Sequence, residues 1–264
     1  MARAARDELT DVAADAAIDQ ACRILRLPTI RDRHGEIAAA AARQQAGYKG
    51  FLVELLSLEC DDREARRKAR LVREAAFPRP KRIEDFDYAA NPNVPAALIA
   101  TLAKSAWVAA GQPCCLIGDS GTGKTHLLIG LGLAACEQGR RVRYVTTAAL
   151  VNELVEAADQ RALSRVVGRY GRLDLLLLDE LGYVQIDPRG AELLFQIITE
   201  RDERASIAIG TNLPFSEWGT VFPDPRLVAA IVDRVTFNAH IVETGTESYR
   251  LATSKTTTRR KRMA

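Results

Sequence analysis

The sequence predicts an α/β fold, in which a parallel sheet is covered by helices and preceded by a small all-α domain. Two observations predict it. Between about residues 95 and 251, short apolar runs typical of buried strands alternate with helical segments, the pattern of a parallel sheet with helices on both faces. Residues 1–76 contain helical patterns and little else. With 264 residues, 47% hydrophobic and 27% charged, the chain has room for one or two globular domains, which excludes collagen, coiled-coil rods and wholesale disorder.

The N-terminal helices end in a proline-rich segment. Apolar residues recur at helical spacing between Phe51 and Leu58, and Pro78 ends the charged helix that follows. Residues 77–94 are rich in Pro and Asn, so we interpret them as an interdomain strap that its aromatic side chains pin to a neighbouring surface. These aromatic residues are Phe77, Phe86 and Tyr88. The predicted parts are a helical domain over 1–76, the linker strap over 77–94, the α/β domain over 95–251 and a basic tail over 252–264.

Within the α/β domain, length and periodicity separate strands from helices. Apolar runs of four to seven residues predict buried strands, whereas longer apolar segments predict helices. In chain order they are a helix Pro95–Ala110, a strand Cys114–Ile117, a helix His126–Cys136, a strand RVRYVT, helices over 148–169, a strand LDLLLLD, a helix over 190–203, a strand ASIAIGT, and a helix and strand over 226–243.

The net charge is only +3, but the chain contains two strongly basic segments. Residues 61–82 carry nine Lys or Arg against four Asp or Glu, and the tail 252–264 carries five basic residues and no acidic one. The rest of the chain therefore sums to −7. This concentration of positive charge indicates a polyanionic partner, although a solvated helix face followed by a frayed tail would give the same pattern.

Targeting and redox features point to the cytoplasm. The longest uninterrupted apolar run, Leu127–Cys136, has ten residues, about half of what a membrane span needs. The first residues lack an apolar segment after their positive charges, so no signal peptide is predicted. The five cysteines show no CxxC spacing, which disfavours both a disulfide framework and a zinc site. We therefore expect a soluble cytoplasmic protein that makes no membrane contact.

The glycine-rich turn after the first strand matches the phosphate-loop pattern G-x-x-x-x-G-K-[ST]. Glycines let the backbone curl so that successive N–H groups face an anion, and the following helix directs its positive dipole end to the same place. Lys124 is expected to reach the β- and γ-phosphates of ATP, and the Thr125 hydroxyl to ligate Mg²⁺. His126 either faces the nucleotide or only begins the helix. The predicted nucleotide-binding residues are Gly118, Asp119, Ser120, Gly121, Thr122, Gly123, Lys124, Thr125 and His126.

Adjacent acids end the strand LDLLLLD. A buried strand delivers Asp179 and Glu180 to the carboxyl edge of the sheet, where Asp179 is predicted to hold Mg²⁺ and Glu180 to polarise an attacking water. The second acid favours hydrolysis over transfer to another substrate. An exposed strand end carrying two acids is common, so this interpretation depends on the lysine loop upstream.

Two further residues are candidates for catalysis. Asn212 ends the strand ASIAIGT and is predicted to contact the γ-phosphate or the attacking water, unless it only begins a turn. Arg234 follows every strand that reaches the phosphates, so we expect it to act on the nucleotide of a neighbouring subunit. The alternative for Arg234 is an intrahelical or intersubunit salt bridge that involves Asp233.

A spacing of four residues places three arginines on one predicted helix face. Arg161, Arg165 and Arg169 would form a positive stripe with Arg172 that tracks a DNA backbone. A solvated helix face is the more frequent cause of such a stripe.

Together these motifs resemble the IstB-like transposition helper ATPases, a family of AAA+ proteins similar to bacterial helicase loaders. The resemblance runs from about Leu25 to Leu251. The segments that carry it are LRLPTIRD, FLVELLSLECDDREARR, AAFPRPKRIEDFD, GDSGTGKTHL, LLLLDELGYVQID, AELLFQIITERDER, GTNLPFSEWG, DPRLVAAIVDRV and ESYRL. The resemblance implies an ATP-dependent, DNA-binding oligomer that an insertion sequence encodes beside its transposase. It would assemble on duplex target DNA and stimulate that transposase.

The resemblance also assigns roles. It matches Asp179 and Glu180 to the magnesium and water-activating acids, Asn212 to the first sensor, and Arg234 to the arginine that acts in trans. Only thirteen residues follow Leu251, too few for the helical lid of AAA+ proteins in general. The lid is thus expected to be absent or reduced, which leaves a second sensor arginine unassigned, with Arg250 as a candidate.

Two other functions compete with the helper ATPase. A replicative helicase loader would use ATP as a switch around single-stranded DNA, and only the resemblance of ELGYVQ, LPFSEW and ESYRL favours the helper over it. A small-molecule kinase is disfavoured, because adjacent acids suit water activation and no signature of an acceptor pocket is present.

Overall fold

The computed structural model describes residues 2–249 of the chain, and the side chains of residue 10 and of residues 12–249. The predicted basic tail and Arg250 lie outside these described residues. Among the helices that are described, none is long and apolar enough to cross a membrane. The helices are α1 (Ala2–Leu25), α2 (Pro28–Arg43), α3 (Tyr48–Glu74), α4 (Ala96–Ala103), α5 (Ala106–Ala109), α6 (Lys124–Glu137), α7 (Thr147–Asp159), α8 (Leu163–Gly171), α9 (Pro188–Arg201), the 3₁₀ helix η1 (Phe215–Thr220) and α10 (Pro225–Thr236). The strands are β1 (Cys114–Gly118), β2 (Val142–Thr146), β3 (Leu175–Leu181), β4 (Ser206–Thr211) and β5 (His240–Gly245).

The chain forms two compact units. The first ends at Ala69 and the second begins at Arg70, so the division falls inside α3. The sequence prediction instead placed the end of the helical domain at residue 76 and a separate strap over 77–94. In the structure the strap residues belong to the second unit, because Phe77, Phe86 and Tyr88 pack against its core.

The first unit packs α1, α2 and the first part of α3 around a small apolar core. Its buried members are Cys22, Ile30, Ile37 and Leu55. A buried carboxylate also holds this unit together. Glu59, only 3% exposed on α3, accepts hydrogen bonds from the backbone N–H groups of Thr29 at 2.8 Å and Ile30 at 3.2 Å. These N–H groups lie in the first turn of α2 and have no partner within their own helix, so Glu59 caps α2 from another element.

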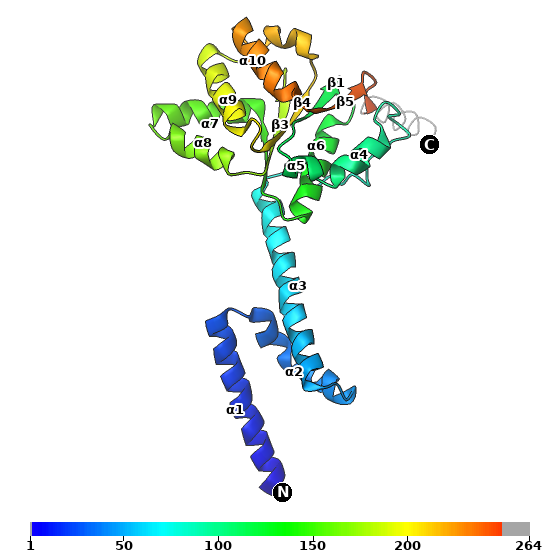
Figure 1. The fold of residues 1–264 in the computed structure, drawn as a ribbon, viewed down its shortest axis with the longest axis vertical. Helices are drawn as coiled ribbons and strands as arrows, with labels where there is room; N and C mark the ends of the chain where they lie inside the picture. The colour runs from blue at the N-terminus through cyan, green and yellow to red at the C-terminus, as the bar shows by residue number, and fades with distance from the viewer. Residues whose placement is uncertain (1, 250–264) are drawn as a thin grey trace, which may run out of the picture. The chain divides into compact units, whose positions relative to one another are not determined.

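Five parallel strands form the sheet of the second unit, in the order β2-β3-β4-β1-β5. Helices α7, α8, α9 and α10 lie on one face, and α4, α5 and α6 lie on the other (Figure 1). Each face has its own apolar core. Because both faces are covered, strands β3 and β4 are buried along most of their length, which confirms the predicted sheet.

One predicted helix is interrupted in the structure. The helix predicted over Pro95–Ala110 is divided into α4 and α5 at Ser105, which has a left-handed φ of 55°. The helices predicted over 148–169 are α7 and α8, and a second break without a helix-ending residue separates them: Arg161 lies in the turn between them with a φ of 56°. Neither break contains Gly or Pro, so the residues that normally signal a helix end are missing.

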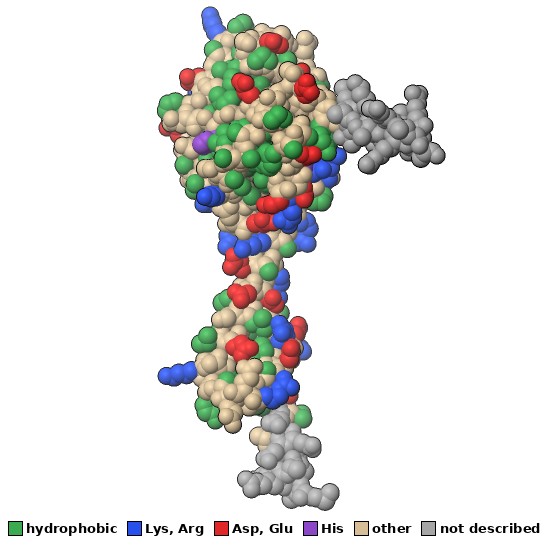
Figure 2. Space-filling view, turned by 90° about the vertical axis from the view of Figure 1, so that its right-hand side faces the viewer, with side chains coloured by type: hydrophobic (Ala, Val, Ile, Leu, Met, Phe, Trp, Pro, Cys, Tyr) green, Lys and Arg blue, Asp and Glu red, His purple; other side chains and the backbone are tan. Residues whose placement is uncertain are grey.

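Acidic and basic side chains lie interspersed along the second half of α3 (Figure 2). Lys68 pairs with Glu64 at 2.6 Å, and Arg70 approaches Glu74 to 3.8 Å, both at the i,i+4 spacing. Part of the positive charge predicted for residues 61–82 is therefore compensated within the helix itself.

All five cysteines are free thiols. Cys60, on α3, is exposed, and the other four are buried. Burial raises the pKa of Cys115 and of Cys136 to about 12, so these two thiols stay protonated near neutral pH.

Candidate functional site

A cavity of about 410 Å³ lies in the second unit, at the carboxyl ends of β1 and β3. It brings together the predicted phosphate loop and the two predicted acids, with residues of the strap on its other side. The residues that line it are Arg79, Lys81, Asp85, Phe86, Asp87, Asn91, Ser120, Gly121, Thr122, Gly123, Lys124, Thr125, His126, Asp179, Glu180, Tyr183 and Tyr249.

The loop between β1 and α6 needs its glycines. Gly121 and Gly123 have φ angles of 86° and 99°, which L-residues with a side chain rarely adopt. A Cβ atom on Gly123 would lie 2.5 Å from Cε2 of Phe86. These two positions let the backbone close into a cradle at the N-terminus of α6, the geometry that suits a phosphate.

Lys124 is the first residue of α6 and is 6% exposed. Its Nζ donates hydrogen bonds to the carbonyl oxygens of Gly118 at 2.6 Å and Asp119 at 2.7 Å. The ammonium group is thus fixed at the loop rather than extended into solvent. Its positive charge adds to that of the α6 N-terminus, so this part of the cavity favours an anion.

Partners from distant segments hold the phosphate loop in place. Asn91 donates from Nδ2 to the carbonyl oxygens of Thr122 and Thr244, both at 2.9 Å. The backbone N–H of Tyr249 donates to the Gly121 carbonyl at 3.1 Å. Sequence reasoning missed Asn91, because nothing in its local pattern distinguishes it from a turn residue of the strap.

His126 is the third residue of α6 and lines the cavity. Its Nε2 donates to the carbonyl oxygen of Arg82 at 2.7 Å, and its ring meets that of Phe86 edge-on at 5.4 Å. The strap is therefore joined to α6 directly beside the loop.

Asp179 is buried, 2% exposed, at the end of β3. Its Oδ2 accepts hydrogen bonds from Thr125 Oγ1 at 2.8 Å and from the Tyr144 hydroxyl at 2.9 Å. Gly210 on β4 leaves room for this carboxylate, because a Cβ there would lie 2.5 Å from Asp179 Oδ1. A hydroxyl and a carboxylate oxygen in contact are the oxygen donors that Mg²⁺ prefers, so the residues present fit this ion.

Tyr144 was not predicted as a site residue. Burial and the neighbouring Asp179 carboxylate raise the pKa of its phenol well above the ordinary value. The phenol therefore stays protonated and remains a hydrogen-bond donor to Asp179. The sequence does not mark Tyr144 as a site residue, because aromatic residues are common in strands such as RVRYVT.

Glu180 projects from an irregularity in the sheet. The register between β3 and β4 shifts between Leu178 and Leu181, and Glu180 has a left-handed φ of 62°. It is exposed and lines the cavity. A non-glycine residue in this conformation costs on the order of 1–3 kcal/mol, and here the result is a carboxylate that points out of the sheet beside Asp179.

Asn212 directly follows β4 and lies beside this irregularity, but it does not line the cavity. Its Oδ1 is buried and has no hydrogen-bond partner among the described residues. A Cβ on Gly182 would lie 2.6 Å from this oxygen. The structure thus places an amide oxygen without a hydrogen-bond partner among the described residues close to Gly182, two residues after Glu180.

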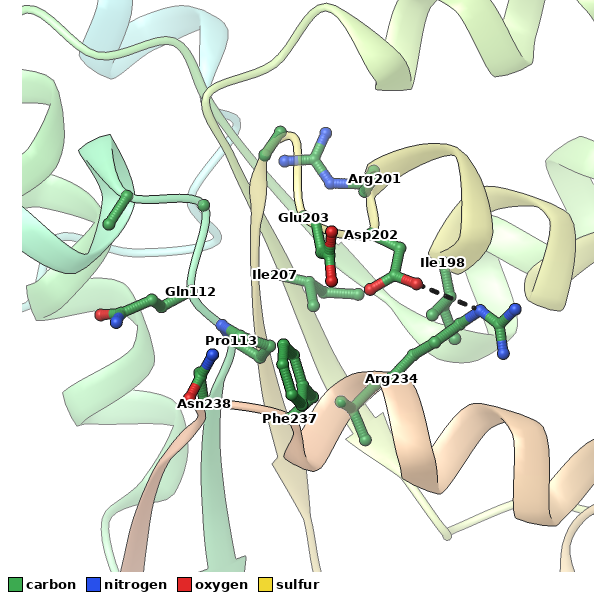
Figure 3. Close-up of a pocket in the computed structure, with 14 residues that line it drawn as sticks. Gln112, Pro113, Ile198, Arg201, Asp202, Glu203, Ile207, Arg234, Phe237 and Asn238 are labelled. Atoms are coloured by element: carbon green, nitrogen blue, oxygen red, sulfur yellow. Dashed lines mark ion pairs between the residues drawn. The ribbon is translucent and has the colours of Figure 1, made fainter.

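Arg234 does not line the nucleotide cavity of its own chain. It lines a second cavity, of about 160 Å³, formed by α9, α10 and neighbouring loops. Its Nε lies 3.4 Å from Asp202 Oδ2, the ion pair drawn in Figure 3, and its guanidinium stacks on Phe195 at 5.0 Å. The intrahelical salt bridge with Asp233 that was the alternative for Arg234 is wrong, because within the described chain the ion pair is made with Asp202. The intersubunit form of that alternative stays a prediction.

The predicted arginine stripe on one helix is also wrong. Arg161 lies in the turn before α8, whereas Arg165 and Arg169 lie on α8 and Arg172 follows its end. Arg169 forms an ion pair with Glu153 on α7 and stacks on the ring of Tyr170. The charge of Arg169 is therefore already paired with a carboxylate of the same chain.

Comparison with known proteins shows which family the chain belongs to. Residues 20–257 match the family described as IstB-like ATP binding protein. The chain belongs to this family. This confirms the resemblance drawn from the motifs.

Two curated IstB-like relatives match along most of their length. A putative insertion sequence ATP-binding protein of Sinorhizobium fredii is 40% identical over 227 residues, which are 86% of this chain and 76% of that protein. A putative ATP-binding protein of an insertion sequence from Geobacillus stearothermophilus is 33% identical over 234 residues, 89% of this chain and 93% of that protein.

Solved structures are similar to this IstB-like chain in fold. DnaA from Aquifex aeolicus bound to AMPPCP has a TM-score of 0.54 at 22% identity, covering 64% of this chain and 51% of that one. DnaI has a TM-score of 0.52 at 19% identity, covering 66% and 93%. At this level of identity the likeness concerns the fold alone, and it agrees with the predicted parallel sheet covered by helices.

Proposed function

We propose that this IstB-like protein binds ATP with Mg²⁺ in the 410 Å³ cavity and hydrolyses it to ADP and phosphate. The observation that carries the proposal is the meeting of Lys124, Thr125, Asp179 and Glu180 around one cavity, although they come from two elements far apart in the chain. The family description names ATP. A DnaA structure of similar fold was solved with the ATP analogue AMPPCP.

Each residue has a distinct task in this reaction. The loop N–H groups and Lys124 bind the β- and γ-phosphates, and Thr125 with Asp179 would hold the magnesium ion. A bound Mg²⁺ supplies charge neutralisation on the phosphate oxygens. Glu180, exposed beside Asp179, accepts a proton from the attacking water, and the Asn212 amide orients the water or the γ-phosphate.

We further propose that Arg234 completes the site of a neighbouring subunit in an ATP-dependent oligomer. Arg234 is about a quarter exposed and lies outside the nucleotide cavity of its own chain. Its fork of donors suits the charge that develops on a transferring phosphoryl group. In the single chain Asp202 holds the arginine, so assembly would exchange this partner for the neighbour's phosphate.

Arg234→Ala should bind ATP nearly as well as the parent but hydrolyse it poorly, even with DNA present. Mixing it with Lys124→Ala should restore part of the ATPase activity, because the second variant can lend its arginine to the intact pocket of the first. Asp202→Asn is the control: it breaks the ion pair, as Arg234→Ala does, but it leaves the arginine in place and should keep the activity. If co-assembly is confirmed by sizing and no mixing ratio restores activity, Arg234 acts only within its own chain.

The biological role that we propose is that of a transposition helper, which assembles on duplex target DNA with ATP and assists the transposase of its insertion sequence. The curated relatives are insertion-sequence proteins, which favours this role. Arg161, Arg165 and Arg172 are exposed and are candidates for DNA contacts. Arg169 is a weaker candidate because of its pair with Glu153.

The test is assembly of the full chain with ATP on duplex and on single-stranded DNA of equal length, followed by size-exclusion chromatography and electron microscopy. We expect ATP-dependent assembly on the duplex. Assembly on single strands alone would instead support the helicase loader, the alternative that acts on single-stranded DNA. Assembly without regard to ATP would contradict both roles.

A further inference from the structure

Three different elements supply the hydrogen bonds that hold the Asp179 carboxylate. Oδ2 accepts from Thr125 on α6 at 2.8 Å and from Tyr144 on β2 at 2.9 Å. Oδ1 accepts from the backbone N–H of Glu180 at 2.9 Å. Thr125 and Glu180 already have tasks in the proposed reaction, whereas the hydroxyl of Tyr144 has none.

Tyr144 is itself rigidly placed. Its backbone N–H donates to the Ala75 carbonyl at 2.8 Å, and in the sheet it pairs with Leu177 of β3. Its ring packs against the apolar core on one face of the sheet. A tyrosine side chain has few rotatable bonds, so a fixed backbone and a packed ring deliver its hydroxyl to one position.

We propose that Tyr144 is a positioning residue that orients Asp179 for Mg²⁺ and thereby sets the affinity of the site for the metal. Thr125 is itself a candidate ligand, so Tyr144 is the side-chain donor that holds Asp179 without taking part in coordination. Partners of this kind orient the carboxylates that ligate metals, and their loss lowers metal affinity. The inference rests on the proposed function, because it assumes that nucleotide and Mg²⁺ bind in this cavity.

Tyr144→Phe tests the inference, since it keeps the ring and removes only the hydroxyl. Binding of a fluorescent, non-hydrolysable ATP analogue to the full chain is followed in EDTA and across a MgCl₂ titration. We expect unchanged affinity in EDTA, and a half-saturating Mg²⁺ concentration raised by about 10- to 100-fold. Because the experiment measures binding, a defect in ATP hydrolysis does not affect the result.

The chain offers a matched control in Tyr170. Its hydroxyl donates to Glu153 Oε2 at 2.7 Å, and its ring is 1% exposed in the same unit, but it does not line the nucleotide cavity. Tyr170→Phe removes the same kind of phenol–carboxylate bond. Both variants should lower the melting temperature by similar amounts, whereas only Tyr144→Phe should change the Mg²⁺ requirement.

Two different results would overturn the inference, and they distinguish its failure from a failure of the proposed function. If the parent protein responds to Mg²⁺ and Tyr144→Phe requires no more Mg²⁺ than Tyr170→Phe, the positioning role is wrong while the proposed function stands. If the parent protein binds the analogue with no response to Mg²⁺, the proposed function fails and the inference fails with it.

Discussion

Glu180→Gln should leave ATP binding and assembly intact while turnover falls by about 10²–10⁴-fold, the range typical for loss of a general base. The amide has nearly the shape of the carboxylate and can still lie beside the water, but it cannot accept the proton. Glu180 is exposed and projects from the irregularity after Leu178, so the substitution removes no packing. The variant should therefore accumulate the ATP-bound assembly on DNA.

Steady-state phosphate release and nucleotide binding, measured on the same preparation, check this result. Glu192→Gln, on the exposed side of α9, makes the same chemical change away from the cavity and should leave both unchanged. Parent-like turnover of Glu180→Gln would mean that another group activates the water.

Lys124→Ala should abolish nucleotide binding at ordinary concentrations. The substitution removes one positive charge and its contacts to two phosphates. At about 1.5–3 kcal/mol for each charge-assisted hydrogen bond, two such bonds correspond to a loss of affinity of about 100-fold or more. The loop also loses the bonds that Nζ donates to the carbonyl oxygens of Gly118 and Asp119.

Isothermal titration with ATP and Mg²⁺ measures the loss. Lys104→Ala, at the exposed C-terminal end of α4, removes the same charge far from the loop and should bind ATP like the parent. A melting curve shows whether the loop change has disturbed the fold. Unchanged affinity in a folded Lys124→Ala protein would contradict the assignment of the phosphate loop.

The site features whose placement the sequence predicted are contiguous in the chain. The phosphate loop lies between an apolar strand and a helix within a short segment, and Asp179 and Glu180 directly follow an apolar run. Local pattern and spacing are enough for such motifs, because parallel strands bring their carboxyl ends to one edge of the sheet.

The features that were missed depend on contacts between distant segments. Tyr144 reaches Asp179 from the neighbouring strand of the sheet, Asn91 reaches the loop from the strap, and Glu59 caps a helix other than its own. Nothing local marks these residues. Arg161 was predicted on the same helix as Arg165 and Arg169 for a different reason. The turn between α7 and α8 contains neither Gly nor Pro, so the sequence carries no signal that a helix ends there.

The distribution of the thiols makes the native chain ready for spectroscopic labelling. Cys60 is the exposed cysteine, and the buried ones react slowly with maleimides because the reagent needs an accessible thiolate. A fluorophore attached at Cys60 would therefore report from the first unit without any engineered cysteine. Paired with a fluorescent nucleotide added to the protein, it would make energy transfer a direct readout of nucleotide binding, measurable with and without added DNA.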